Sequence, residues 1–226
     1  MAPVGAPDAE ALRAACAELM ADYDTAGWWP ADSAFEIMVG AVLVQNTRWS
    51  HVSRAIEALR RSACLSPRSL ARTTLGDLTG LIRSAGCQQV KARRLHALAD
   101  GVLQAGSLSA LARRPTVRLR TELLSWHGIG EETADAILLF AFNRPGFLGD
   151  AYARRWLSRR GLFDAGTGTG AYRRAKAFVD ERLDCSAAQH QALHGAIILH
   201  CQQLCRVRPL CDSCIQAAIC LYKTDN

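Results

Sequence analysis

The stretch LLSWHGIGEETADAILLF, residues 123–140, is the most informative part of this chain. Apolar residues recur at helical spacing on both sides of His127-Gly128-Ile129-Gly130, which predicts two helices joined by a tight turn. The two glycines let the backbone turn sharply and leave N–H groups unhindered at the start of the second helix, where a phosphate oxygen can bind. An ordinary helical hairpin is the alternative, since a bare Gly-x-Gly turn has no specific chemistry.

Helical periodicity continues in both directions from this stretch. Ser33 followed by Glu36 indicates a capping box at the start of a very apolar helix that ends near residues 45–47. Asp150 opens an arginine-rich helix, and further helices cover the C-terminal part of the chain. Because no segment of useful length alternates with the period of a strand, the sequence predicts an all-α fold.

The composition excludes several classes of protein. Half of the 226 residues are hydrophobic and 21% are charged, so the chain is not disordered as a whole. Its apolar stretches are far shorter than the about 20 residues of a membrane helix. The N-terminal residues lack the basic start and apolar run of a signal peptide. We therefore expect a soluble, cytoplasmic protein.

Arginine dominates the positive charge. The chain has 27 Lys+Arg against 21 Asp+Glu, a net charge of +6, and its lysines are only Lys91, Lys176 and Lys223. Arginine binds phosphate through two parallel hydrogen bonds, and a basic globular protein often binds nucleic acid. A GC-rich genome, which replaces lysine by arginine throughout, explains the same composition equally well.

Five of the nine cysteines lie between residues 201 and 220. An odd total without a secretion signal argues against a disulfide framework and for a metal site. The C-terminal end of the chain is therefore a candidate metal centre.

Five segments together resemble the endonuclease III superfamily of helix-hairpin-helix DNA glycosylases. They are the hairpin, GDAYARRW at 149–156, AVLVQNT at 41–47, GCQQVKARRL at 86–95 and the terminal cysteines. The resemblance spans almost the whole chain and implies a two-lobed helical fold. We expect an N-terminal segment (1–32) that packs with the C-terminal lobe. A helical barrel domain (33–145) with the hairpin at 116–142 follows, and then a C-terminal lobe (146–226).

The resemblance implies that Asp150 is catalytic, because the family has an Asp at the head of the helix after the hairpin. An ordinary N-cap is the alternative interpretation, since Asp is favoured there. Bifunctional members have a lysine in the second hairpin helix that attacks the sugar, and Glu132 stands at that position here. Adenine glycosylases have a glutamate where this chain has Ala41. The chain thus resembles a monofunctional glycosylase.

The resemblance also implies a set of DNA contacts. Gln45 matches a glutamine that fills the gap left in duplex DNA when a nucleotide rotates out of the stack. The hairpin amides and several arginines would bind phosphates. The expected DNA-binding residues are Gln45, Asn46, Lys91, Gly128, Ile129, Gly130, Thr133, Arg154, Arg155, Arg206 and Arg208.

The aromatic residues resemble those of the bacterial 3-methyladenine glycosylases of the same superfamily, in which aromatic rings enclose a flipped purine. The matching positions are Trp28, Trp29, Pro30 and Trp49. Indole faces attract cations, and an N3- or N7-alkylated purine carries a positive charge that normal bases lack. Packing in the interior is the alternative for these tryptophans, and it is the role expected for Trp126 and Trp156.

Cys205, Cys211, Cys214 and Cys220 resemble the four-cysteine loop that holds a [4Fe–4S] cluster in this family. The first gap is one residue shorter than in endonuclease III, which leaves Cys201 as an alternative first ligand. A zinc site is the rival, but zinc sites usually contain two short chelates and only one is present. The expected role is structural and electrostatic, because hydrolysis of a glycosidic bond needs no electron transfer.

The expected function is that of a monofunctional DNA glycosylase of base-excision repair. It would be a monomer in the bacterial cytoplasm, associated with the nucleoid, and would act on double-stranded DNA and not on membranes. Its expected substrate is an alkylated base such as 3-methyladenine. The alternatives are an endonuclease III-like glycosylase for oxidised pyrimidines and a non-catalytic protein that senses DNA damage.

Overall fold

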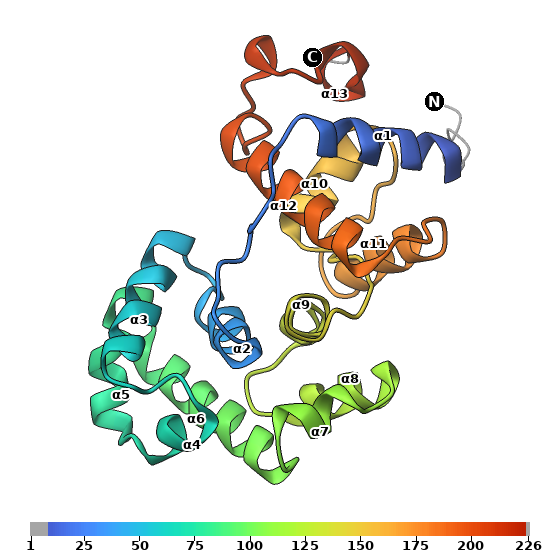
Figure 1. The fold of residues 1–226 in the computed structure, drawn as a ribbon. Coiled ribbons are helices and arrows are strands. Elements are labelled where there is room, and N and C mark those ends of the chain that lie inside the picture. Colours follow the sequence, from blue (N-terminus) through green and yellow to red (C-terminus); the bar gives the residue numbers. More distant parts are fainter. Residues whose placement is uncertain (1–8, 225–226) are drawn as a thin grey trace. The chain divides into compact units, whose positions relative to one another are not determined.

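The protein, seen in a computed structural model that describes residues 9–224, is built from helices (Figure 1). Residues 1–8 of the expected N-terminal segment 1–32, residues 225 and 226, and the side chains of 223 and 224 lie outside the description. No strand occurs in the described range. The prediction of an all-α fold is confirmed.

The chain divides into two compact units. Unit 1 combines the N-terminal residues up to Trp28 with everything from Pro145 onward, and unit 2 is Trp29–Arg144. The sequence prediction placed its boundaries at 32/33 and 145/146. Each unit has its own apolar core, so each is described by itself below.

Unit 2 surrounds α2 (Ala34–Leu43), which is buried on nearly every side. Its sequence AFEIMVGAVL is almost wholly apolar because α6 and α9 both pack against it. The N-cap Ser33 accepts the Glu36 N–H at 3.1 Å, as expected. The helices that complete the unit are α3 (Trp49–Arg61), α4 (Pro67–Arg72), α5 (Leu75–Leu81), η1 (Arg83–Ala85), α6 (Gln88–Gln104), α7 (Leu108–Ala112), α8 (Thr116–Ser125) and α9 (Glu131–Phe142).

The second half of the predicted capping box is wrong. The Glu36 carboxylate is buried, but it accepts the Asp32 N–H at 3.4 Å and the Arg60 guanidinium at 2.6 Å rather than the Ser33 N–H. A positive charge on α3 therefore orients this carboxylate. A local sequence motif could not indicate that partner, which lies 24 residues away in the sequence.

Unit 1 packs α10 and α1 against α12 around the buried Trp156. The packing role expected for this tryptophan is confirmed, and its ring is 1% exposed. Trp126 of unit 2 also packs against its core, with its indole beside Gly101. The helices of unit 1 are α1 (Ala9–Ala21), α10 (Ala151–Arg159), α11 (Ala171–Asp180), α12 (Ala187–Gln203), η2 (Cys211–Ser213), η3 (Ala217–Ile219) and α13 (Leu221–Thr224).

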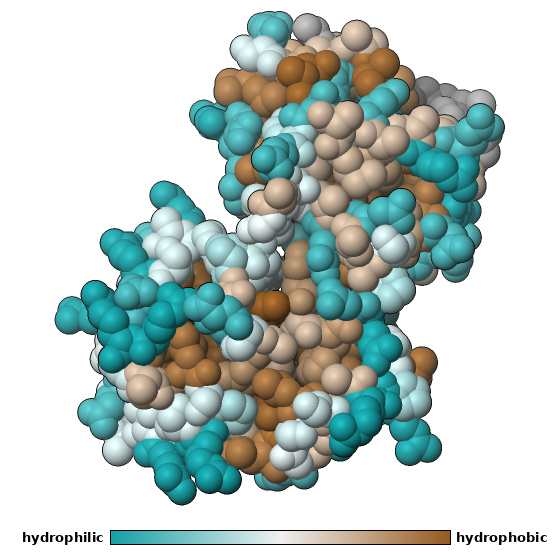
Figure 2. Space-filling view, viewed as in Figure 1, coloured by the Kyte–Doolittle hydropathy of each residue, from teal (hydrophilic) through white to brown (hydrophobic). Residues whose placement is uncertain are grey.

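Hydrophilic side chains cover much of the visible face of each unit, and apolar ones gather at the end of unit 1 that carries α13 (Figure 2). Within residues 9–224, each helix is too short or too polar to cross a bilayer. The exposed apolar residues of the cysteine-rich end are Val207, Leu210, Ile215, Ile219 and Leu221.

Candidate functional site

The predicted hairpin turn joins α8 to α9 in unit 2. Gly128 has φ +85°, and a Cβ there would lie 2.2 Å from Cγ of Arg94, so only glycine fits both the backbone and the space. The Ile129 N–H donates to the Trp126 carbonyl at 3.1 Å, and the Ile129 side chain is buried. The prediction that the Ile129 amide binds phosphate is therefore corrected, because the turn itself uses that donor. Gly130 is the N-cap of α9 with an extended backbone.

Gln45 is fixed on this turn by hydrogen bonds at both ends of its amide group. Its Nε2 donates to the Gly128 carbonyl at 3.1 Å and to Oγ1 of Thr133 at 2.9 Å. Its Oε1 accepts from the Arg94 guanidinium. The structure thus brings together three residues that the sequence suggested separately, and adds Arg94, which sequence reasoning missed.

Lys91 requires a correction. The sequence predicted that it contacts DNA, but its side chain is 3% exposed and its ammonium lies inside unit 2. Nζ donates to the carbonyls of Leu43 and Ala85 at 2.9 and 2.8 Å. Burial lowers the pKa of this ammonium. The neighbouring prediction, Asn46, is an exposed residue with φ +55° just beyond α2.

The candidate base-pocket residues are distributed over both units. In unit 2, the Trp29 ring lies 5.3 Å from the Trp49 ring, edge to face, and 4.8 Å from the Phe140 ring. Trp29 and Trp49 are half-buried, and the Trp29 indole N–H is buried with no hydrogen-bond partner in the described chain. Trp28 belongs to unit 1, where its indole packs against Gly195 of α12. Pro30 is exposed.

Asp150 is the N-cap of α10 in unit 1 and is 7% exposed. One carboxylate oxygen accepts the Ala153 N–H at 2.7 Å. Burial raises the pKa of Asp150 to about 6. Backbone hydrogen bonds and the charges of Arg154 and Arg155 act in the opposite direction. The N-cap interpretation is confirmed, and the same carboxyl group is held in a buried place where its ionisation is costly.

The two arginines predicted after Asp150 differ in their surroundings. Arg155 donates to the Cys205 carbonyl at 2.8 Å and to the Cys201 carbonyl at 3.4 Å, so it also holds the cysteine loop. Arg154 and Arg155 are half-buried, and Arg206 and Arg208 are exposed. For these four, binding to DNA stays a prediction.

The four predicted cysteine ligands line one hollow of about 360 Å³, which includes space open to solvent. Arg159 borders this hollow, and its guanidinium donates to Sγ of Cys205 at 3.3 Å. The Cys201 thiol is almost completely buried and hydrogen bonds to Cys205, which raises the pKa of Cys201 and lowers the pKa of Cys205. This environment favours Cys205 over Cys201 as the thiolate. The four cysteines that line the hollow are Cys205, Cys211, Cys214 and Cys220.

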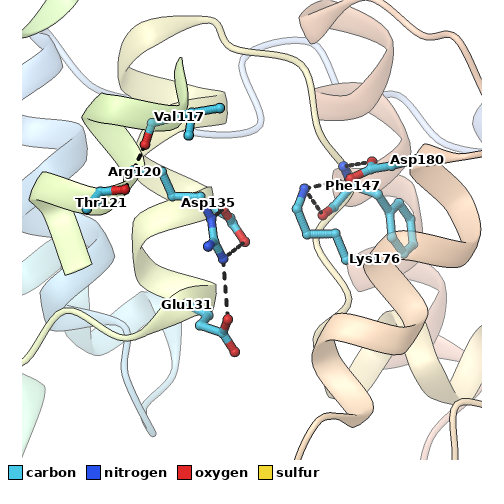
Figure 3. Close-up of polar contacts among 8 residues, drawn as sticks. All are labelled: Val117, Arg120, Thr121, Glu131, Asp135, Phe147, Lys176 and Asp180. Atoms are coloured by element: carbon cyan, nitrogen blue, oxygen red, sulfur yellow. Dashed lines mark hydrogen bonds and ion pairs between the residues drawn. The ribbon is translucent and has the colours of Figure 1, made fainter. Parts of the chain in front are cut away.

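The second hairpin helix is tied to the first by charge (Figure 3). Arg120 of α8 donates to both carboxylate oxygens of Asp135 in α9, at 2.7 and 3.1 Å, and lies 3.5 Å from Glu131. Glu132 is exposed in the first turn of α9, where an acid suits the positive end of the helix. The sequence had indicated neither Arg120 nor Asp135. Their spacing across the turn could have suggested the pair.

Known proteins agree with this architecture. The model of the HhH-GPD superfamily of base excision DNA repair proteins matches residues 39–179. A Methanocaldococcus jannaschii protein, provisionally named a DNA repair glycosylase, is 36% identical over 204 residues, 89% of this chain and 91% of its own.

Two solved structures resemble the protein over most of its length. H. pylori 3-methyladenine DNA glycosylase, bound to 1,N6-ethenoadenine, has a TM-score of 0.74 at 26% identity over 87% of this chain and 98% of its own. An endonuclease III trapped on DNA has a TM-score of 0.81 over 97% and 98%, and at 19% identity it shows the fold alone. The chain belongs to the HhH-GPD superfamily of base excision DNA repair proteins and is a DNA N-glycosylase.

Proposed function

We propose that this glycosylase is monofunctional and removes alkylated, positively charged purines from double-stranded DNA without cutting the strand. The aromatic group formed by half-buried Trp29 and Trp49 with the buried Phe140 carries the proposal. Indole faces attract a cationic base more strongly than a neutral one. The similarity to a 3-methyladenine glycosylase that holds an ethenoadenine supports the same substrate class. Trp28 and Pro30 stay predictions for this role.

Asp150 supplies the chemistry in this proposal. When ionised, it stabilises the positive charge that develops on the sugar as the glycosidic bond breaks, and it accepts a proton from the attacking water. An alkylated purine is already a good leaving group, so no general acid is needed. The backbone N–H groups that bind the Asp150 carboxylate, including that of Ala153 at 2.7 Å, fix it before the substrate arrives.

The absence of strand cleavage follows from position 132. A lyase needs an amine that attacks the sugar, and an exposed glutamate stands where the bifunctional relatives are expected to carry it. Lys91 cannot replace it, because its ammonium donates to two buried carbonyls inside unit 2.

The phosphate contacts that we propose use the hairpin of unit 2. Gly128 allows the tight turn, and Gly130 leaves the backbone accessible at the N-terminus of α9, where the helix dipole favours an anion. A Cβ on Gly130 would meet nothing within 4 Å. Thr133 is nearly buried and binds Gln45, so its share in DNA binding is indirect.

We further propose that Cys205, Cys211, Cys214 and Cys220 hold a [4Fe–4S] cluster. They line one hollow, and four thiolates can each bind a different iron of a cubane cluster. The sequence contains one short chelate, Cys211 and Cys214, whereas zinc sites usually contain two. The cluster would brace the loop, and Arg206 and Arg208 on that loop would supply its positive charge.

The test is a panel of duplexes, each with one defined lesion, scored for free base and then for strand breaks with and without alkali. We expect release of 3-methyladenine or 7-methylguanine and breaks only after alkali. Breaks without alkali would refute the monofunctional assignment. Release of thymine glycol without any alkylpurine would establish the oxidised-pyrimidine alternative. Tight binding to lesion DNA without release of any base would support the alternative of a non-catalytic damage sensor.

A purified sample tests the cluster directly. Brown protein that absorbs near about 400 nm and contains about four irons per chain is expected. Anaerobically prepared protein that is colourless and contains about one zinc per chain would contradict the cluster.

A further inference from the structure

The segment 145–150 that leads into α10 is irregular and yet buried. Phe147, Leu148, Gly149 and Asp150 are all shielded from solvent, although none of them lies within a helix or strand. Buried backbone N–H and C=O groups outside regular structure need other partners, because an unpaired one costs about 1–3 kcal/mol. Something in unit 1 must therefore hold this segment.

The partners come from one ion pair on α11. The Phe147 N–H donates to Oδ1 of Asp180 at 2.7 Å, and the Phe147 carbonyl accepts from Nζ of Lys176 at 3.2 Å. The two side chains bind each other at 2.8 Å, one helical turn apart (Figure 3). Both polar groups of one buried peptide residue are thus bound by a single Lys–Asp pair.

Two glycines show how closely the segment approaches α11. A Cβ on Gly149 would lie 2.4 Å from the Tyr172 carbonyl oxygen and 3.0 Å from the Lys176 amide nitrogen. A Cβ on Gly146 would lie 2.8 Å from Nζ of Lys176. The segment therefore packs against the backbone of α11 at Gly149 and against the Lys176 ammonium at Gly146.

We propose that Lys176 and Asp180 are positioning residues for Asp150. They fix Phe147, three residues upstream, so that the chain enters α10 with the Asp150 carboxylate already aimed as a buried N-cap. Neither residue touches the carboxylate. The inference rests on the proposed catalytic role of Asp150, because only then does its placement matter for base release.

A purely structural role is the competing explanation, and the surrounding charges make the two separable. His190 of α12 faces the ion pair and is buried with its Nδ1 unpaired within the described residues. Arg154 and Arg155 of α10 and Cys201 of α12 face Asp150. Variants of Lys176 or Asp180 leave all of these groups in place. Asp180→Asn and Asp180→Leu remove the same negative charge, so a difference between their Asp150 titrations reports the position of the carboxyl group and not the lost charge.

The experiment uses the full chain with four variants. Asp180→Leu removes both interactions, Asp180→Asn keeps an acceptor for the Phe147 N–H, and Lys176→Met removes the ammonium. Arg61→Met is the matched control, because it breaks an exposed ion pair with Glu57, also one helical turn apart. Circular dichroism and thermal melts check folding, and Asp180→Asn is the variant that tests the inference if Asp180→Leu does not fold.

The first readout is the single-turnover rate of base release with enzyme in excess. A misplacement of about 1 Å costs on the order of 10²-fold in rate, so we expect about a 10- to 100-fold loss for Asp180→Leu. Asp180→Asn should lose less, and DNA affinity should stay within about 2-fold for all variants. Rates within 2-fold of wild type for both Asp180 variants would overturn the inference.

The second readout needs no substrate. The carboxyl carbon of Asp150 is followed by NMR against pH in ¹³C-labelled protein and assigned by its loss in Asp150→Asn. Asp180→Asn shifts the midpoint only through the lost charge. In Asp180→Leu a loosened segment also admits water, so its midpoint should lie about one unit below that of Asp180→Asn, while Arg61→Met should leave the wild-type midpoint unchanged. Equal midpoints in folded Asp180→Leu and Asp180→Asn contradict the positioning role. If the wild type releases no base, the proposed function fails, and this titration still decides the placement.

Discussion

The two lysines whose side chains the structure describes differ in an instructive way. Lys91 of unit 2 donates to the Leu43 carbonyl, two residues before Gln45, and Lys176 of unit 1 donates to the Phe147 carbonyl, three residues before Asp150. Both ammonium groups hold the backbone that leads into a proposed functional residue. Lys91, however, binds two carbonyls, whereas Lys176 also binds a carboxylate.

Arginine could not replace either lysine easily. In a chain that otherwise uses arginine, each of these ammonium groups binds two oxygens at once as a compact point charge, which a planar guanidinium does not reproduce. The two lysines differ in the residue that follows each held segment. Asp150 is the buried N-cap of α10, whereas the Gln45 side chain makes hydrogen bonds that DNA could replace. In the proposed function, one segment is fixed for chemistry and the other is held until DNA binds.

The largest expected effect separates the two downstream residues. Asp150→Asn should lower the single-turnover rate of base release by about 10³-fold or more, because an uncharged amide cannot stabilise the developing positive charge. Gln45→Ala should lower it by only about 10-fold, since it acts on the DNA and not on the sugar. Chromatographic assay of free base measures both. Binding of Asp150→Asn to lesion DNA should persist, and unchanged turnover in this variant would remove Asp150 from the mechanism.

A second effect is the pH dependence of catalysis. Because burial raises the pKa of Asp150 to about 6, base release should rise about tenfold per pH unit below that value and level off above it. An exposed aspartate would level off near pH 4. The sign for stability is opposite: the raised pKa favours the folded state at low pH, and this contribution is lost as pH rises through about 6. Rates from pH 4.5 to 8, corrected with an enzyme-free blank, measure the profile.

Stability should distinguish the two lysines themselves. Lys91→Met leaves the buried carbonyls of Leu43 and Ala85 without a donor, at about 1–3 kcal/mol each. Lys176→Met should cost about 1 kcal/mol, because its side chain is 22% exposed and water can reach the Phe147 carbonyl. Urea unfolding followed by circular dichroism measures both. Equal losses would mean that the two ammonium groups are equivalent and that the comparison fails.

The sequence carried most of the fold and part of the site. Periodicity and the Gly-Ile-Gly turn were sufficient for α8, α9 and the all-α class, because they depend on local pattern. Asp150 could be placed because an N-cap is a local feature. Lys91 was misassigned, since nothing local tells that its ammonium reaches Leu43 rather than solvent.

Long-range contacts explain the other errors. Arg94 was missed because its side chain fills the space beside Gly128, and that contact exists only once α6 packs beside the hairpin. Arg155 was assigned to DNA because it follows the predicted catalytic Asp, and its hydrogen bonds to the carbonyls of Cys201 and Cys205 were not foreseen. For Lys91 and Arg155 the side chain was interpreted correctly as a donor, but these carbonyl partners lie far away in the sequence.

The smallest expected effect tests whether the hairpin turn keeps Gln45 away from DNA or orients it for insertion. Thr133→Val keeps the shape of the side chain and removes the acceptor of one Gln45 hydrogen bond, while the bonds to Gly128 and Arg94 remain. A typical hydrogen bond contributes about 0.5–1.5 kcal/mol, so a side chain that must leave the turn should now leave more easily.

Thr133→Val should therefore bind a duplex with an abasic-site analogue about 2- to 5-fold more tightly, with unchanged affinity for undamaged duplex. The gain should vanish in a Gln45→Ala background, where no amide is left to release, and fluorescence anisotropy measures all four affinities. Weaker binding by Thr133→Val would mean that the turn orients Gln45 for insertion. Gln45 would then resemble Asp150, each prepared for its task by the segment that a lysine holds.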